Sequence, residues 1–231
     1  MKYLIVAAHP DDEVLGAGGT MFNLSSSGHE VHVAFMASEV EERNARPDDK
    51  KLRTDISESL AILGTSSIFY GGFPNIKMNT VPHLHCVQFV ESIIEKIAPD
   101  FIITHHPNDL NNDHNHTSLA VQAASRLFQR GQVDPLNALL FMEVPSATDW
   151  ALNTSMNFFS PNIFFHIAKE GLDKKISALD KYSGVMRPFP HPRSSEVITG
   201  LAACRGGQSG YEYAEAFELA FGRLSVKFRS L

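Results

Sequence analysis

Residues 3–19 of the chain read YLIVAAHPDDEVLGAGG, and this stretch decides the fold class. Its first six residues form a continuous apolar run of strand length, a pattern typical of a strand that is covered on both faces in a parallel sheet. His9 ends the run, consecutive carboxylates follow at positions 11–13, and a glycine-rich segment comes next. Unpaired negative charge at the end of a buried strand is costly, so the sequence predicts a cation at this point.

Strand-like and helix-like segments alternate through the first two-thirds of the chain. The patterns predict strands over 30–38, 67–73, 101–104 and 137–146, and helices over 18–28, 48–64, 80–97 and 117–130. Such alternation implies right-handed crossovers between parallel strands. We therefore predict an α/β fold, a Rossmann-like three-layer sandwich with a mostly parallel sheet and helices on both faces.

The last third of the chain has a less regular pattern. It favours a strand near 162–167, a helix over 170–184, a proline-rich turn at 188–192 and a helix near 194–204. Residues 214–228 fit a strand or a helix equally well. Because no repeat or linker interrupts the pattern, residues 1–231 are predicted to form a single domain.

The composition excludes several classes of protein. The formal net charge of −6 argues against a general nucleic-acid partner or an acidic membrane surface. Cys86 and Cys204 are far apart and form no CxxC motif, so they indicate neither a disulfide framework nor a cysteine zinc site. The apolar N-terminal run is too short for a signal peptide or a membrane span, and we expect a cytoplasmic protein.

Two loops are the places to search for a site, because ligands of open parallel sheets bind beyond the carboxyl ends of the strands. Both loops are rich in histidine and aspartate. The loop after the first strand carries His9, Asp11, Asp12 and Glu13, and the loop after strand 101–104 carries His105, His106, Asp109, Asp113, His114 and His116. A set of His, Asp and His with open coordination positions suits a catalytic divalent metal such as zinc.

Two other interpretations of the acidic, glycine-rich segment are weaker. GAGG at residues 16–19 resembles part of a dinucleotide-binding loop, but the chain lacks GxGxxG here and the preceding acids would repel a pyrophosphate. The acids could instead form a solvated helix N-cap cluster that the helix dipole stabilises.

AHPDDEVLGAGGT at residues 8–20 resembles the signature of the LmbE-like (PIG-L) family of zinc-dependent N-acetylglucosaminyl deacetylases. The similarity continues in family order with Arg53 before LAILG, then NNDHNHT, SPNIFF, HPRSSEVI and RGGQSGYEYAEAF. It extends over almost the whole chain. The resemblance therefore implies that residues 1–231 form one LmbE-like deacetylase domain.

The resemblance also implies roles for residues of the two loops. His9, Asp12 and His114 match the metal ligands, and Asp11 matches the general base. If the loop is extended, the side chains of Asp11 and Asp12 point apart, which suits one to the metal and the other to the water that the metal binds. A carboxylate so placed takes the proton of that water as the water attacks an amide carbonyl.

One position departs from the family pattern. Many relatives have a histidine three residues before the last histidine ligand, and Asn111 takes its place here. An asparagine amide still donates a hydrogen bond to an oxyanion, but it is not an acid. Asn111 and Arg53 join Asp11 as candidate catalytic residues, although Arg53 also fits an ordinary exposed helix cation. Asp113 either orients a neighbouring imidazole or caps the following helix.

The remaining candidates are substrate contacts. The turn FPHPRS at residues 189–194 either presents His191 and Arg193 over the pocket or only closes a loop. We predict that His191, Arg193 and Asp109 bind the substrate. The roles of His105 and His106 stay open, while His116 is expected to be structural or to face solvent.

The sequence thus favours a zinc-dependent carbohydrate N-deacetylase, a hydrolase of linear amide C–N bonds. It would remove the acetyl group from an N-acetylated amino sugar of the N-acetylglucosamine type, or from a conjugate of one. Zn²⁺ is the expected cofactor, with another divalent transition metal as the alternative, and association into a homo-oligomer stays open. Two other functions remain: a zinc amidase acting on a non-acetyl amide or a thiol conjugate, and a non-catalytic sugar- or nucleotide-binding module.

Overall fold

The computed structural model describes residues 1–38, 48–131, 133–151 and 158–224. Its strands are β1 (Lys2–Ala7), β2 (Glu30–Phe35), β3 (Ser67–Tyr70), β4 (Phe101–His105), β5 (Ala138–Met142), β6 (Ile163–His166) and β7 (Ala214–Gly222). Its α-helices are α1 (Asp12–Ser26), α2 (Asp49–Leu63), α3 (His83–Ile97), α4 (Asn112–Ala124), α5 (Ala168–Leu179) and α6 (Ser195–Ser209). Two short 3₁₀ helices, η1 (Met78–Thr80) and η2 (Leu127–Arg130), complete the described elements.

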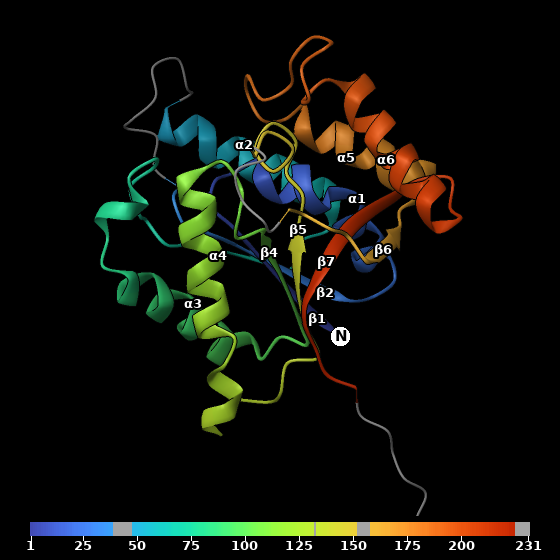
Figure 1. Ribbon diagram of the computed structural model, residues 1–231. Coiled ribbons are helices and arrows are strands. Elements are labelled where there is room, and N and C mark those ends of the chain that lie inside the picture. The colour runs from blue at the N-terminus through green and yellow to red at the C-terminus, as the bar shows by residue number, and fades with distance from the viewer. Residues whose placement is uncertain (39–47, 132, 152–157, 225–231) are drawn as a thin grey trace, which may run out of the picture.

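One sheet organises these elements in the order β3-β2-β1-β4-β5-β7-β6 (Figure 1). The first five strands in this order are parallel, whereas β7 runs antiparallel to both of its neighbours. The predicted α/β fold with a mostly parallel sheet is therefore confirmed. The strand order reverses between β1 and β4, so their carboxyl ends flank the crevice where such sheets bind ligands.

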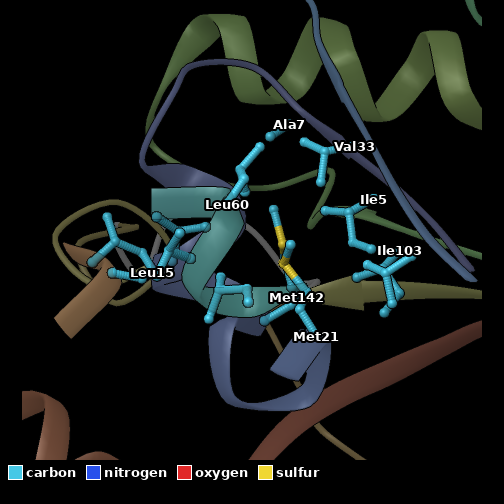
Figure 2. Packing of buried hydrophobic residues seen from close by; sticks show 14 of the residues in the cluster. Ile5, Ala7, Leu15, Met21, Val33, Leu60, Ile103 and Met142 are labelled. Carbon is cyan, nitrogen blue, oxygen red and sulfur yellow. The ribbon is translucent and has the colours of Figure 1, made fainter. Parts of the chain in front are cut away.

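Alternate residues of β1 enter two different cores. Ile5 and Ala7 pack on the face that α1, α2, α5 and α6 cover, whereas Leu4 and Val6 pack on the face of α3 and α4 (Figure 1). Figure 2 shows the first core, in which residues of neighbouring strands lie beside one another. Complete burial of each large aliphatic side chain contributes about 1.5–3 kcal/mol. This two-sided burial explains why β1 is apolar at every position after Lys2.

Helix α1 starts earlier than the sequence predicts. Its first residue is Asp12 and not a residue of the glycine-rich segment, because carboxylates in the first turn face the positive end of the helix dipole. The glycines lie within the helix. A Cβ at Gly16 would lie 2.5 Å from Sδ of Met142 on β5, and one at Gly19 would lie 2.9 Å from Cδ1 of Ile167. These glycines let α1 pack closely on its neighbours.

Other boundaries also differ from the prediction. Helix α4 begins at Asn112, five residues before the predicted start, and α6 continues to Ser209. The described part of the ambiguous C-terminal segment is strand β7, which lies between β5 and β6. No helix in the described ranges is both long enough and apolar enough to cross a bilayer.

Candidate metal centre

The two histidine-rich loops meet at the carboxyl ends of β1 and β4. His9 and Asp12 come directly after β1, and His114 lies in the first turn of α4, which follows β4. The Nδ1 atom of His9 is 3.2 Å from Oδ2 of Asp12, and the Nε2 atom of His114 is 3.1 Å from the same oxygen. One ligand atom from each residue lies within 4.8 Å of the others, and all three residues are buried.

In each imidazole the inner nitrogen faces Asp12, and the outer nitrogen faces a second carboxylate. The Nε2 atom of His9 lies 3.0 Å from Oδ2 of Asp113, and the Nδ1 atom of His114 lies 3.1 Å from Oδ2 of Asp109. Such carboxylate–histidine pairs fix the ring orientation and the tautomer of a metal ligand. The inner nitrogens are thereby directed at Asp12. The residues present therefore fit a divalent cation held by two nitrogens and one oxygen.

The supporting carboxylates are themselves anchored. Asp113 accepts hydrogen bonds from the backbone N–H groups of Ile76 (2.6 Å) and Met78 (3.1 Å). Asp109 accepts one from the Thr148 hydroxyl at 2.8 Å. Since these groups come from two segments that are far apart in the sequence, the tertiary fold fixes the orientation of the His9 and His114 rings.

The electrostatics indicate a site that lacks positive charge. Burial raises the pKa of the Asp12 carboxyl, but the facing imidazole of His114 outweighs burial and holds that pKa well below its usual range. Burial lowers the pKa of His114, but Asp12 and Asp109 outweigh it and raise the pKa to about 10. A proton on His114 and a metal ion at this point compete for the same nitrogen.

His105 supports the site without joining the His9, Asp12 and His114 set. Its Nε2 atom accepts the backbone N–H of Ala8 at 2.8 Å, and its ring stacks on that of His114 with centroids 3.9 Å apart. Burial lowers the pKa of His105 to about 3, so the ring is neutral. Atoms of His105, Asp109 and His114 also lie within 4.8 Å of one another, but Ala8 already uses the Nε2 atom of His105.

Asp11 occupies the N-cap of α1 with a strained backbone. Its φ is 115° and its ψ is −31°, so the extended loop expected from the sequence is wrong. The buried Glu13 accepts the backbone N–H of Asp11 at 3.0 Å, and the hydroxyl of Tyr182 donates to the other oxygen of Glu13 at 2.5 Å. A positive φ at a non-glycine residue is unfavourable and persists only where its surroundings impose it.

A cavity of about 400 Å³ lies beside Arg193, which pairs with Asp11. Arg193 lines it and places Nη1 3.2 Å from Oδ2 of Asp11, while its Nε atom donates to the hydroxyl of Ser146 at 2.8 Å. The predicted site residues Asn111, His191 and Arg193 line it, and so does Arg187, which the sequence did not indicate. The full lining consists of Leu110, Asn111, Ser146, Ala147, Trp150, Arg187, His191 and Arg193.

Asn111 is the N-cap of α4. Its side-chain oxygen accepts the backbone N–H of Asp113 at 2.9 Å, so the amide group remains to donate toward the cavity that Asn111 lines. Of the two interpretations of Asp113, the structure shows the imidazole contact, and the imidazole is that of His9.

Comparisons with known proteins give the family. Residues 4–125, more than half of the chain, match the family model described as PIG-L, GlcNAc-PI de-N-acetylase. The chain belongs to the PIG-L family. The predicted resemblance is thereby confirmed. No curated protein sequence matches this PIG-L chain.

Solved structures similar to this PIG-L chain share its fold at low sequence identity. The conserved protein TT1542 from Thermus thermophilus aligns with a TM-score of 0.79 and 21% identity over 99% of each chain. GalB, the 4-carboxy-2-hydroxymuconate hydratase from Pseudomonas putida, has a TM-score of 0.77 and 20% identity over 99% of this chain and 100% of its own. The N,N'-diacetylchitobiose deacetylase from Pyrococcus horikoshii has a TM-score of 0.71 and 18% identity over 94% of this chain and 83% of its own.

Some predicted site residues of this PIG-L chain belong neither to the His9, Asp12 and His114 set nor to the lining of the cavity around Arg193. Arg53 is exposed on α2, and its guanidinium stacks on the ring of Tyr70 at 3.6 Å. Asp109 is buried behind His114 and does not line the cavity around Arg193. His106 accepts the backbone N–H of Asn108 through Nδ1 at 3.2 Å. His106 and His116 belong to neither metal-ligating group among the described residues.

The sequence patterns place Glu13 in the first loop without a role of its own, and they do not indicate Tyr182 or Arg187 as site residues. Glu13 carried a signal, because it is a third carboxylate directly after the Asp11–Asp12 pair and is fully buried. Burial raises the pKa of Glu13 to about 8, against the opposing effect of the Tyr182 hydrogen bond. Tyr182 and Arg187 carried no local signal, since each reaches the site only through the tertiary fold.

Proposed function

We propose that this chain is a metal-dependent N-deacetylase that hydrolyses the acetamide of an N-acetylated amino sugar or its conjugate. The observation that carries the proposal is the convergence of the His9, Asp12 and His114 ligand atoms within 4.8 Å, next to Asp11. The PIG-L family and the diacetylchitobiose deacetylase among its structural neighbours support this choice of reaction.

His9, Asp12 and His114 would hold the ion, and Zn²⁺ is the ion we expect from two imidazoles and one carboxylate. When bound, such an ion acidifies a water molecule and polarises the amide carbonyl. Asp113 and Asp109 would fix the direction of the His9 and His114 rings when the ion is bound, since each carboxylate lies about 3 Å from the ring nitrogen that faces away from Asp12.

Asp11 is the general base of the proposed reaction. Its carboxylate would take a proton from the attacking water and return it to the nitrogen of the leaving amine, so that acetate and a free amine are formed. Glu13 and Tyr182 hold its backbone in the conformation that this task requires. Arg193 pairs with the same carboxylate, with Nη1 3.2 Å from Oδ2 of Asp11.

Asn111 is the oxyanion donor of the proposal. Because its oxygen accepts the N-cap hydrogen bond, its amide N–H groups remain available as donors. A fixed donor of this kind stabilises the tetrahedral intermediate. Asn111 cannot protonate the amine, so Asp11 performs both proton transfers.

The test is hydrolysis of N-acetylated amino sugars by the zinc-loaded protein. An amine-specific assay measures the free amine that is formed together with acetate. The panel contains free, phosphorylated and lipid-linked acetamido sugars, together with analogues that carry longer acyl chains. Hydrolysis of at least one acetamide supports the proposal, and preference for a longer acyl group makes the enzyme a different amidase. Binding without hydrolysis of any compound in the panel would contradict both the deacetylase and the amidase, and would favour a binding module.

A second candidate is a metal-dependent hydratase of a carboxylate-bearing substrate. The observation that favours it is Asn111, because addition of water to a double bond needs no acid for a leaving amine. The GalB hydratase among the structural neighbours supports the same alternative. The hydratase would be favoured over the deacetylase if the absorbance of an unsaturated carboxylate falls as water adds to its double bond, while no acetate is released from acetamides.

A further inference from the structure

We propose that Thr148 is a positioning residue of the metal centre, because its hydroxyl group holds Asp109 in the orientation in which Asp109 supports the ligand His114. The proposal rests on the metal site of the proposed function and adds a residue from a part of the chain that supplies none of the three proposed ligands. Thr148 lies beyond residues 4–125, which match the family model, so membership of the family does not assign it a role.

The backbone of a tight turn after strand β5 fixes the position of the Thr148 hydroxyl. The N–H of Thr148 donates to the carbonyl oxygen of Val144 at 2.9 Å. In the opposite direction, the N–H of Val144 donates to Oγ1 of Thr148 at 2.8 Å. Val144 is fully buried and Thr148 is 8% exposed, so bulk water has little access to these groups. The hydroxyl oxygen is therefore held in place by its own turn.

The hydrogen of this hydroxyl is directed at Asp109. A hydroxyl group that accepts a hydrogen bond still has its own hydrogen to donate. Oγ1 of Thr148 donates to Oδ2 of Asp109 at 2.8 Å, and the same Oδ2 atom lies 3.1 Å from Nδ1 of His114. One carboxylate oxygen thus joins Thr148 to the imidazole. Hydrogen bonds to a charged acceptor are stronger than those between neutral groups, so this contact holds the carboxylate firmly.

Thr148 completes the support of the Asp109 carboxylate. The other oxygen, Oδ1, accepts the backbone N–H of Asn111 at 2.8 Å. The terminal torsion of an aspartate side chain is broad, so one fixed oxygen does not by itself fix the plane of the carboxylate. With Asn111 on Oδ1 and Thr148 on Oδ2, both oxygens have a fixed donor besides the imidazole of His114. Without the Thr148 hydroxyl, the carboxylate can turn and directs the imidazole less well.

The two supporting carboxylates of the metal centre differ in this respect. Asp113 accepts from the backbone N–H groups of Ile76 and Met78, which substitution of a side chain does not remove. Asp109 accepts from a side-chain hydroxyl as well as from a backbone N–H group. Replacing Thr148 therefore reaches the metal centre without changing a ligand or a carboxylate that faces one.

A role limited to the turn is the alternative, because the Thr148 hydroxyl also accepts from Val144. Loss of a contact within the turn would lower the free energy of unfolding and leave zinc affinity unchanged. Ser146 provides a matched control on the same turn. Its hydroxyl accepts from Nε of Arg193 at 2.8 Å, instead of donating to Asp109. The two hydroxyl groups therefore separate an effect of the turn from an effect on the metal ligand.

The experiment measures the zinc affinity of Thr148→Val by competition with a chromophoric chelator. Valine keeps the shape of threonine but lacks the hydroxyl, and we expect the dissociation constant for zinc to rise by about 10-fold. Thr148→Ser, which keeps the hydroxyl, and Ser146→Ala should bind zinc as tightly as the wild type. If Thr148→Val does not fold, Thr148→Ala takes its place, because it removes the same hydroxyl without placing a methyl group beside two buried polar groups.

A double-mutant cycle with Asp109→Asn shows whether Thr148 acts through Asp109. In the Asp109→Asn background the charged acceptor is gone, so Thr148→Val should cause little further loss of zinc affinity. The same fold-loss in both backgrounds would make the role of Thr148 merely structural and overturn the proposal. Wild-type zinc affinity in Thr148→Val, or weak binding in Thr148→Ser, would also overturn it.

Turnover separates this proposal from the proposed function. Zinc affinity is measured without substrate, so it decides the role of Thr148 even if the wild type hydrolyses no acetamide and the deacetylase fails. Hydrolysis by the wild type, together with equal zinc affinity in the wild type and Thr148→Val, would support the deacetylase and overturn the proposal. A wild type that binds no zinc would contradict both.

Discussion

Two buried polar groups border helix α1 and differ in how their charges are balanced. The first is the Lys175–Glu215 pair, in which Nζ of Lys175 lies 2.6 Å from Oε1 of Glu215. Lys175 also donates to the carbonyl oxygen of Leu15, and Glu215 accepts the N–H groups of Gly19 and Thr20. Each charged side chain of the pair faces an opposite charge and has backbone hydrogen-bond partners, so the charges of the pair are balanced within the protein.

The second is the metal-edge cluster, defined as His9, Asp12, Asp109, Asp113 and His114. It places three carboxylates around two imidazoles, so it stays negative even when both rings carry a proton. The polar atoms converge on one point instead of pairing off. A buried polar group therefore marks a candidate site when its partners do not balance its charge within the protein.

The largest expected effect is that of Asp11→Asn, which removes the proton acceptor but keeps the shape of the side chain. We expect kcat to fall by about 10²- to 10⁴-fold, with the metal content unchanged. Steady-state kinetics and elemental analysis of the same preparation measure both. Retained turnover would remove Asp11 from the reaction and contradict the proposed mechanism.

Lys175→Met tests the other side of the comparison. Breaking a buried ion pair leaves Glu215 unpaired, and we expect the free energy of unfolding to fall by about 3–5 kcal/mol. The kcat of the remaining folded protein should not change. Lys169→Met is the control, because Lys169 pairs with Asp173 on the surface and its loss should leave denaturant unfolding nearly the same. A loss of activity in folded Lys175→Met would make the pair part of the site.

Asp109→Asn weakens the support of one ligand. The carboxamide no longer offers a charged acceptor to Nδ1 of His114, and metal affinity should fall by about 10- to 100-fold. Competition with a chromophoric chelator measures the change, and Asp134→Asn on the surface is the control. If the two variants bind zinc equally well, Asp109 does not orient the ligand.

Tyr182→Phe is expected to have the smallest effect. The change removes the hydroxyl that donates to Glu13, and the free energy of unfolding should fall by about 1–2 kcal/mol. We also expect kcat to fall with little change in KM, because the backbone of Asp11 loses its support. Tyr211→Phe, at an exposed tyrosine, is the control. A change in KM alone would show that Tyr182 acts on substrate binding.

The sequence was informative where the decisive pattern is local. The apolar run of β1 and the alternation of strands and helices predicted the sheet, because burial on both faces leaves a continuous pattern. The start of α1 was missed, since two acids in a first helical turn look like a polar loop. The conformation of Asp11 was also missed, because Glu13 and Tyr182 impose it through contacts that no short pattern encodes.

The residues around the His9, Asp12 and His114 set were also hard to predict from the sequence. The His9, Asp12 and His114 set follows from family motifs, and the structure brings these residues together. Its outer carboxylates depend on long-range contacts, such as that between His9 and Asp113, which are 104 positions apart. Arg187 was missed because only the turn at 187–193 brings it next to Arg193.

Metal analysis tests the central claim most directly. The wild type and His114→Ala would be purified in parallel, dialysed against zinc and then against buffer, and analysed for metal per chain. His116→Ala, two residues further along the same helix, is the matched control. We predict about one zinc ion per chain in the wild type and in His116→Ala, and almost none in His114→Ala. Equal zinc in the wild type and His114→Ala, or none in the wild type, would contradict the account.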